Sequence, residues 1–224
     1  MPNHITNYLT IFGTKEKTDE ILNTIRSKDR IIDFNKIIPM PKELRYVSSP
    51  PKIVSESEYK EAMIKFKESL KNPSDFEKIV GVSHPITAEM SEDYLERFGA
   101  NDWYNWAIKH WGTKWNSYDN REAGTLPTNA DIFETKIHFH TAWSTPFPVI
   151  QQLSSMFKET VFLLEYYDED IGSNTGKVTL LGGMISNMII PENGSDEAYA
   201  LITQIDPDMR DYIHEILNFK DEEE

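Results

Sequence analysis

The chain has 224 residues, of which 39% are hydrophobic and 12% aromatic, which is enough for a buried core. It contains no cysteine, which excludes disulfides, thiolate metal sites and cysteine nucleophiles. No apolar run approaches the ~20 residues that a membrane helix needs, and the first residues lack the pattern of a signal peptide. We therefore expect a cytoplasmic protein without membrane contact.

The negative charge is concentrated near the C-terminus. Residues 196–224 carry −8 of the formal net charge of −14, which predicts an acidic C-terminal helix and tail at 195–224. An acidic surface repels phosphate backbones, so we expect no direct binding to nucleic acid. Mimicry of a nucleic acid by the clustered acids remains an alternative.

The first element is a strand at residues 4–12. Ile5, Leu9 and Ile11 point to one face, with Asn7 among them, as the two-residue period of a strand requires. Thr14 can then cap a helix whose apolar stripe is Ile21, Leu22 and Ile25.

Residues 42–100 differ in composition, because charges of both signs are dense there. Two capping boxes predict the starts of helices: Ser55 with Glu58, and Ser74 with Glu77. Gly99 is a natural helix end. This segment is expected to be a helical insertion in the domain.

The stretch "NDWYNWAIKHWGTKWNSYD" at 101–119 holds four of the five tryptophans. Asn101 or Asp102 can cap a helix that Gly112 ends. Its apolar stripe has helical spacing and consists of Trp103, Trp106, Ala107, His110 and Trp111. We expect the three tryptophans of the stripe to be mostly buried, with the helix packed on the sheet.

Further strands follow. One is expected to begin near Lys114, and another is expected in "IFETKIHFHTAW" (132–143) after a loop rich in Gly, Pro and Asn. In this second strand Phe133, Ile137, Phe139 and Trp143 should face inward, and Glu134, Lys136, His138 and His140 should face the other way.

The remaining elements complete the order. Thr145 is expected to cap a helix that Pro146 opens, two strands follow in "TVFLLEYYDED" and "KVTLLGGMI", and Asp206-Pro207 opens a closing helix. This order predicts one α+β domain over 1–224: a ferredoxin-like antiparallel sheet with helices packed on one face, plus the insertion and a C-terminal helix.

The strings "MPNHITNYLTIFG", "FNKIIPMP", "NWAIKHWGTKWNSYD" and "FHTAWSTPFPVI" resemble the YubB-like (Api-ninety-two-like) proteins. The most specific piece is "WGTKW" followed by "YD". The resemblance extends along nearly the whole chain except the charged insertion. It implies a ferredoxin-like domain and a setting in phages, plasmids and integrated elements, and it implies no reaction.

One strand face offers candidate ligands for a divalent metal: His138 and His140, with Glu134 as a third ligand. Lys136 lies on the same face, and paired histidines on a strand are common without a metal. We therefore predict neither a metal nor a cofactor, and these three residues remain weak candidates.

The strongest candidates for a binding site are Lys114, Trp115, Asp119 and Trp143. If the corner after the tryptophan helix meets the corner after the 132–143 strand, these side chains would frame an aromatic-walled cleft with a cation and a carboxylate. The alternative is that the rings fill an aromatic core.

No catalytic constellation is found in the sequence. The sequence thus favours a non-catalytic accessory binding protein of a phage or other mobile element, which acts through contacts with an unidentified protein. The alternatives are a metal-dependent hydrolase that uses the His138/His140 face and an acidic mimic of a nucleic acid. The sequence predicts no oligomeric state.

Overall fold

The structure is a computed structural model that describes residues 3–72, 81–128 and 131–223. By its internal contacts the chain divides into two compact units. The first consists of Met1–Ile38 with Trp111–Glu224, and the second is Pro39–His110. The second unit takes in the predicted 42–100 insertion and also most of the tryptophan helix.

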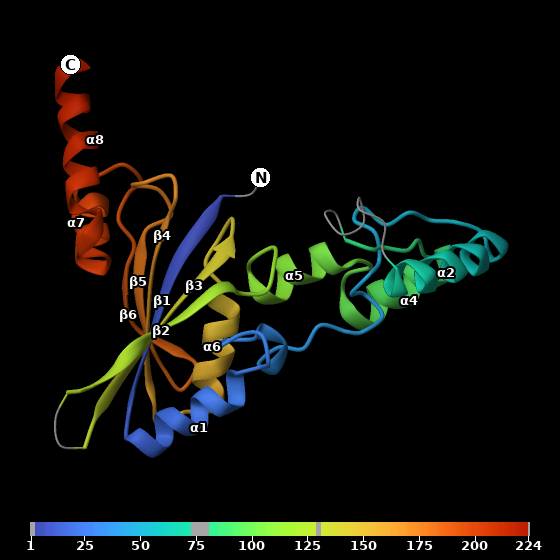
Figure 1. The fold of residues 1–224 in the computed structure, drawn as a ribbon, viewed down its shortest axis with the longest axis horizontal. Helices are drawn as coiled ribbons and strands as arrows, with labels where there is room; N and C mark the ends of the chain where they lie inside the picture. The colour runs from blue at the N-terminus through green and yellow to red at the C-terminus, as the bar shows by residue number, and fades with distance from the viewer. Residues whose placement is uncertain (1–2, 73–80, 129–130, 224) are drawn as a thin grey trace. The chain divides into compact units, whose positions relative to one another are not determined.

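The first unit is built on a six-stranded antiparallel sheet in the order β2-β3-β1-β4-β5-β6 (Figure 1). The strands are β1 (His4–Gly13), β2 (Tyr118–Pro127), β3 (Phe133–Ala142), β4 (Val161–Asp168), β5 (Gly176–Leu181) and β6 (Met184–Ile189). β1 is central and pairs with β3 and β4, while β2 and β6 form the two edges.

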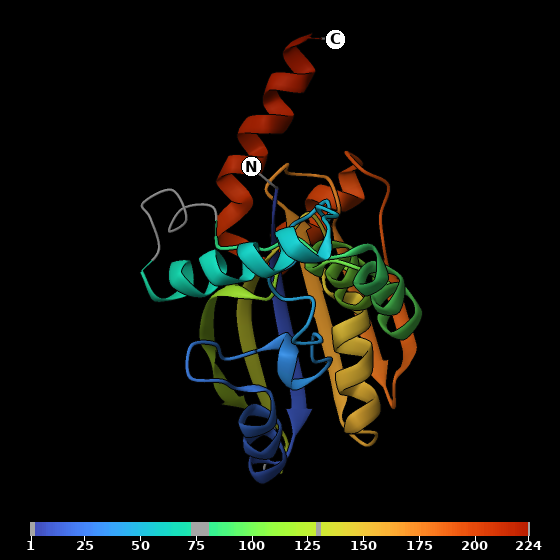
Figure 2. The same ribbon diagram turned by 90° about the vertical axis from the view of Figure 1, so that its right-hand side faces the viewer.

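Helices cover both faces of this sheet. α1 (Lys15–Ile25) and α6 (Phe147–Met156) lie on one face, and α7 (Asp196–Ile205) lies on the other (Figure 2). Because α1 follows β1 and α6 follows β3, the strands β2-β3-β1-β4 with these helices make the ferredoxin-like arrangement. The predicted fold class is confirmed, and β5 and β6 extend the sheet beyond it.

Local signals explain the start of the first unit. The Thr14 side chain accepts a hydrogen bond from the Lys17 N–H and so caps α1, as predicted. The stripe of Ile21, Leu22 and Ile25 is buried, which holds α1 against the sheet by removing apolar surface from water.

Asn7 is a fully buried polar residue on the side of β1 that faces α1 and α6. Its Nδ2 donates to the Ile5 carbonyl and to Thr141 Oγ1, both at 2.9 Å, and its Oδ1 accepts from Thr145 Oγ1 at 2.8 Å. The amide is thus satisfied, as a buried polar group must be. Thr145 was predicted to cap α6, and this is wrong: Pro146 occupies the cap position without a side-chain hydrogen bond.

The opposite face is closed by the C-terminal helices. Tyr8 and Tyr167 both donate to Asp206 Oδ2, at 3.1 and 2.7 Å, and Ile202 and Ile205 pack beside Tyr167. The C-terminal segment was predicted as one helix, but it consists of α7, the short η2 (Pro207–Met209) and α8 (Arg210–Glu223).

Two strand predictions are also corrected. β2 begins at Tyr118 rather than near Lys114, and it continues to Pro127 through the expected loop. The string "KVTLLGGMI" holds two strands, because Gly182 and Gly183 adopt φ of +60° and +80° and turn the chain between β5 and β6. These backbone values favour glycine. β6 is the last strand of the sheet and forms its edge.

The second unit contains α2 (Glu56–Lys71), α4 (Ala88–Phe98) and most of α5 (Trp103–Trp111). Ser55 and Glu58 form the predicted capping box of α2. Gly99 ends α4 in the left-handed conformation, as predicted. The predicted Ser74–Glu77 box lies outside the described residues. No helix in the described part of the chain is long and apolar enough to span a membrane.

The cap and the end of α5 follow the prediction, one of its three stripe tryptophans does not, and its packing on the sheet stays a prediction. The Asp102 carboxylate accepts from the Asn105 N–H and caps it, and Gly112 follows it with φ of +74°. Trp106, Ala107 and Trp111 are buried, whereas Trp103 in the first turn is only partly buried. The Trp111 indole N–H donates to the Ile38 carbonyl at 2.9 Å.

Candidate functional site

Lys114, Trp115 and Trp143 form an exposed aromatic stack on the first unit. The Lys114 ammonium lies 4.9 Å from the Trp115 ring centre and 4.5 Å from that of Trp143, which is the geometry of a cation–π contact. The two tryptophans are 38% and 41% exposed. Trp143 was predicted to face inward, and this is wrong.

The backbone on both sides of this stack is fixed. Thr113 is fully buried, and its Oγ1 donates to the Ala142 carbonyl at 2.8 Å and accepts from the Ala142 N–H at 3.2 Å. The Trp143 N–H donates to the Asn3 carbonyl at 2.9 Å. The corner after α5 is therefore joined to the end of β3, as the sequence hypothesis required.

Trp143 is held in a backbone conformation that tryptophan rarely adopts, with φ of +74°. A left-handed residue other than glycine costs roughly 1–2 kcal/mol. Strain of this kind persists where the surrounding structure enforces it, and it is concentrated at functional positions. In this backbone conformation the Trp143 ring lies against Lys114 and is partly exposed to solvent.

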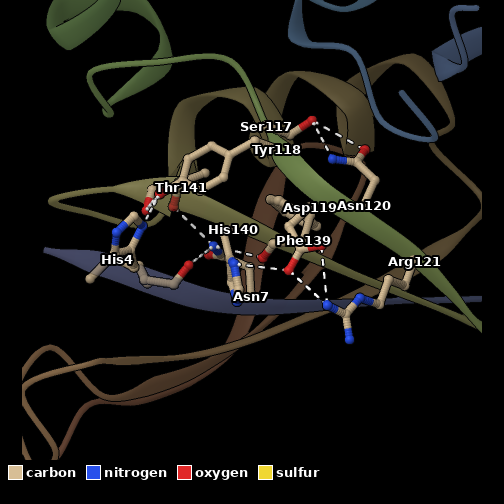
Figure 3. Close-up of polar contacts among 11 residues, drawn as sticks. His4, Asn7, Ser117, Tyr118, Asp119, Asn120, Arg121, Phe139, His140 and Thr141 are labelled. Atoms are coloured by element: carbon tan, nitrogen blue, oxygen red, sulfur yellow. Dashed lines mark hydrogen bonds and ion pairs between the residues drawn. The ribbon is translucent and has the colours of Figure 1, made fainter. Parts of the chain in front are cut away.

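Tyr118 connects the aromatic stack to a polar cluster. Its ring centre lies 6.2 Å from that of Trp115 in an edge-on arrangement. Its hydroxyl donates to the Thr141 carbonyl at 3.0 Å and lies 2.6 Å from His4 Nδ1, so that the imidazole acts as the donor (Figure 3). Burial, and to a lesser extent the charge of Glu169, raises the pKa of Tyr118 to about 12. The phenol therefore stays protonated.

Asp119 lies between two cationic or ionisable groups. Its carboxylate is 3.0 Å from the Arg121 guanidinium and 3.4 Å from His140 Nδ1 (Figure 3). Burial lowers the pKa of His140, and the Asp119 charge opposes this shift only in part. His140 is thus expected to be neutral near pH 7, with Arg121 as the principal counter-charge of Asp119.

Beside this cluster the sheet surface is hollowed. The hollow has a volume of about 510 Å³ and lies on the sheet face that carries Tyr118 and His140. It is lined by His4, Thr6, Tyr118, Asp119, His140 and Glu169. Two carboxylates and an aromatic ring thus border a space that a side chain of a partner can enter.

The weak metal candidates do not converge. His138 and His140 are neighbours, with ring centres 4.9 Å apart, but Glu134 lies four residues from His138 along an extended strand, or ~13 Å. Among residues 3–72, 81–128 and 131–223 no group of three His, Asp or Glu could hold a metal ion. His138 packs on Tyr8, and its buried Nδ1 has no hydrogen-bond partner among the described residues.

The four predicted site residues lie along one surface, but they do not frame one cleft. Lys114 itself fills the space between the tryptophan rings, and Asp119 lies beyond Tyr118, in the hollow. The sequence hypothesis missed His4, Tyr118 and Glu169. A signal existed for Tyr118, which belongs to the "YD" of the family resemblance, but nothing in the sequence shows that β1 brings His4 beside it.

A comparison with known protein families supports the fold. No curated protein matches the chain. A crystal structure of protein api92 from Yersinia pseudotuberculosis is similar at 10% sequence identity with a TM-score of 0.46, and the alignment covers 87% of this chain and all of that one. Residues 110–208, which include β2 to β6 and α7, match the family described as the ferredoxin-like domain in Api92-like protein.

Proposed function

We propose that this chain is a non-catalytic binding protein that contacts a partner protein through one surface of its first unit. We call this the aromatic surface and define it as Lys114, Trp115, Tyr118, Asp119 and Trp143. The observation that carries the proposal is the exposed stack of Trp115 and Trp143 on Lys114. Large exposed aromatic rings are the residues that most often dominate protein interfaces.

The position of Trp143 supports a role in binding over a role in folding. Trp143, which is 41% exposed, removes less apolar surface from water than Trp106 and Trp111, each 4% exposed, while its backbone at φ of +74° opposes folding. The alternative, a ring that completes the core, would require burial of the kind that Trp106 and Trp111 show. Binding to a partner supplies the burial that the free chain does not give.

The hollow beside the aromatic surface indicates the chemistry of the partner. Asp119 and Glu169 border it, and the chain carries a net charge of −14. Arginine or lysine side chains of a partner would be attracted to this surface, and the Tyr118 ring offers them a cation–π contact. We therefore propose a partner with a basic patch. The setting in a phage or other mobile element remains a proposal that rests on the family resemblance.

The test is an affinity capture from the native host with four forms of the protein: the natural chain, Trp115→Ala, Trp143→Gly and Leu126→Ala. Leu126 is a matched control because it is 67% exposed and lies on β2, away from the aromatic surface. We expect one protein to be retained by the natural chain and by Leu126→Ala and to be lost from both tryptophan variants.

Titration calorimetry with that purified protein then measures the effect. Loss of a central aromatic contact of ~2 kcal/mol would weaken binding about 30-fold. Asp119→Asn should also weaken binding, and by a larger factor at low salt than at high salt, because salt screens the attraction between charges. Capture of the same proteins by all four forms would refute the proposal. Displacement of the partner by duplex DNA would instead favour nucleic-acid mimicry.

A further inference from the structure

The edge strand β6 is uncharged, mostly apolar and exposed along its whole length. Every residue from Met184 to Ile189 is exposed, Met184 by 73%. The large apolar residues of this edge are Met184, Ile185, Met188, Ile189 and Ile190. Among the described residues β6 pairs with β5 alone, so its outer backbone N–H and C=O groups face away from the sheet.

The opposite edge is better protected than β6, which has one register shift and no charge or proline. β2 carries Asp119, Arg121 and Glu122, ends at Pro127 and has two register shifts against β3. Charges, proline and bulges are the devices by which natural sheets prevent pairing with another chain. Residues 178–190 contain no charged residue at all, in a chain that is 27% charged.

We propose that β6 is a self-association edge, on which a second copy of this chain pairs its own β6 in antiparallel orientation about a twofold axis. Such pairing is self-complementary, because each strand offers the other the same backbone groups and the same side chains. It would join the two six-stranded sheets into one continuous sheet. This inference is independent of the aromatic surface, which lies at the β2 side of the sheet.

The distribution of charge allows a second copy to bind at this edge. Two chains that each carry −14 repel one another over most of their surfaces. The uncharged stretch 178–190 is where two copies can approach without bringing like charges together. A basic partner, by contrast, would gain nothing from this edge.

The exposed apolar area is of the size that a dimer requires. The exposed parts of the five residues of the edge, with those of Leu181 and Met156 nearby, amount to roughly 600 Å². A standard interface buries about 800 Å² on each partner, so the apolar contact and the flanking atoms together reach it.

The register of β6 limits how the strands can pair. Asn187 opposes Thr179 while Ile185 opposes Leu180, so that Ser186 is an extra residue in β6. The regular part is therefore Asn187–Ile189, and we place the twofold axis there, near Met188.

Sedimentation equilibrium from ~1 to ~100 μM tests the proposal. We expect the natural chain to form dimers within this range and Met188→Lys to remain a monomer, since a lysine at the seam would be buried against its own copy. Leu126→Lys, on the protected edge, should leave the dimer intact. Both sites are exposed, and unchanged circular dichroism and urea midpoints will show that the variants are folded.

Because the chain has no cysteine, a single introduced cysteine can form a disulfide only between two copies. Under mild oxidation Met188→Cys should give a covalent dimer in high yield, and Leu126→Cys should not. A natural chain that is monomeric at ~100 μM, or equal cross-linking at both positions, would overturn the proposal. Met188→Lys should retain any partner bound by the aromatic surface, so the two proposals can fail separately.

Discussion

At the scale of single residues, Trp143 is the position where local backbone preference and side-chain identity conflict. We predict that Trp143→Gly leaves the unfolding free energy unchanged or raises it by about 1 kcal/mol, because glycine adopts φ of +74° without strain. Trp143→Ala keeps the strained backbone and should be about 1 kcal/mol less stable than the glycine variant. Urea denaturation of both variants measures the difference.

The opposite result is equally informative. If Trp143→Gly lowers the unfolding free energy by more than ~2 kcal/mol, the ring stabilises the fold through Lys114 and Trp115. The proposed binding role of Trp143 would then lose its main argument.

The lowered pKa of His138 predicts that the stability of the protein depends on pH. Burial, and next the neighbouring His140, lower its pKa from the ordinary 6.5. The unfolded chain therefore binds more protons below about pH 6.5, so the contribution of His138 is fully present above that pH and is lost as the pH falls. We expect the urea midpoint to drop between about pH 7.5 and pH 5.5, and less so in His138→Gln. An equal drop in both would contradict this prediction.

At the scale of elements, the end of α5 shows what a buried tryptophan of the cluster contributes. Trp111 packs edge-on against Phe34 with ring centres 5.7 Å apart and donates to the Ile38 carbonyl. Trp111→Ala should lower the unfolding free energy by about 3–5 kcal/mol, and Trp111→Phe, which removes the hydrogen bond, by about 1 kcal/mol. Trp103→Ala should cost less than Trp111→Ala, since Trp103 is only partly buried. Chemical denaturation gives all three values.

The sequence predicted those elements whose signals are local. The Thr14 cap, the Ser55–Glu58 box and the Gly99 end depend on residues within four positions of each other, and all three are confirmed. The errors have a non-local cause. Thr145 looks like a cap, but Asn7, which is 138 positions away in the sequence, takes its hydroxyl. The turn at Gly182-Gly183 was missed because apolar residues continue on both sides of it.

At the scale of the whole molecule, the division into two units makes a prediction about excision. The first unit leaves off at Ile38 and resumes at Trp111, and these residues are joined by the 2.9 Å hydrogen bond from the Trp111 indole. A short Gly/Ser linker can therefore replace 39–110 with a small loop-closure cost. We expect the shortened chain to fold, with cooperative urea unfolding and the strand-rich circular dichroism of the sheet.

Failure of the shortened chain to fold would show that residues 39–110 contribute stability that the first unit cannot supply. The two proposed surfaces offer a control, because both lie within the first unit. A folded shortened chain should still form the β6 dimer.

The site was predicted less completely than the fold, and the reason is geometric. Trp115, Lys114 and Asp119 are neighbours in sequence, and the family resemblance drew attention to them. His4 and Glu169 reach the hollow only because β1 pairs with both β3 and β4, which no local pattern records. Lys114 was expected at the wall of a cleft, but its side chain occupies the space between the rings.

The buried amide of Asn7 also bears on which of several strand pairings the chain selects. A slip of β1 by one residue against β3 would turn Asn7 to the other face of the sheet, away from Thr141 and Thr145. Thr141 and Thr145 would then lose their hydrogen bonds to Asn7, and a lost hydrogen bond to a buried group costs about 1–3 kcal/mol. An apolar residue at position 7 would tolerate several alignments almost equally. The asparagine therefore makes the native alignment unique, and the positions of His4 and Tyr118 follow from it.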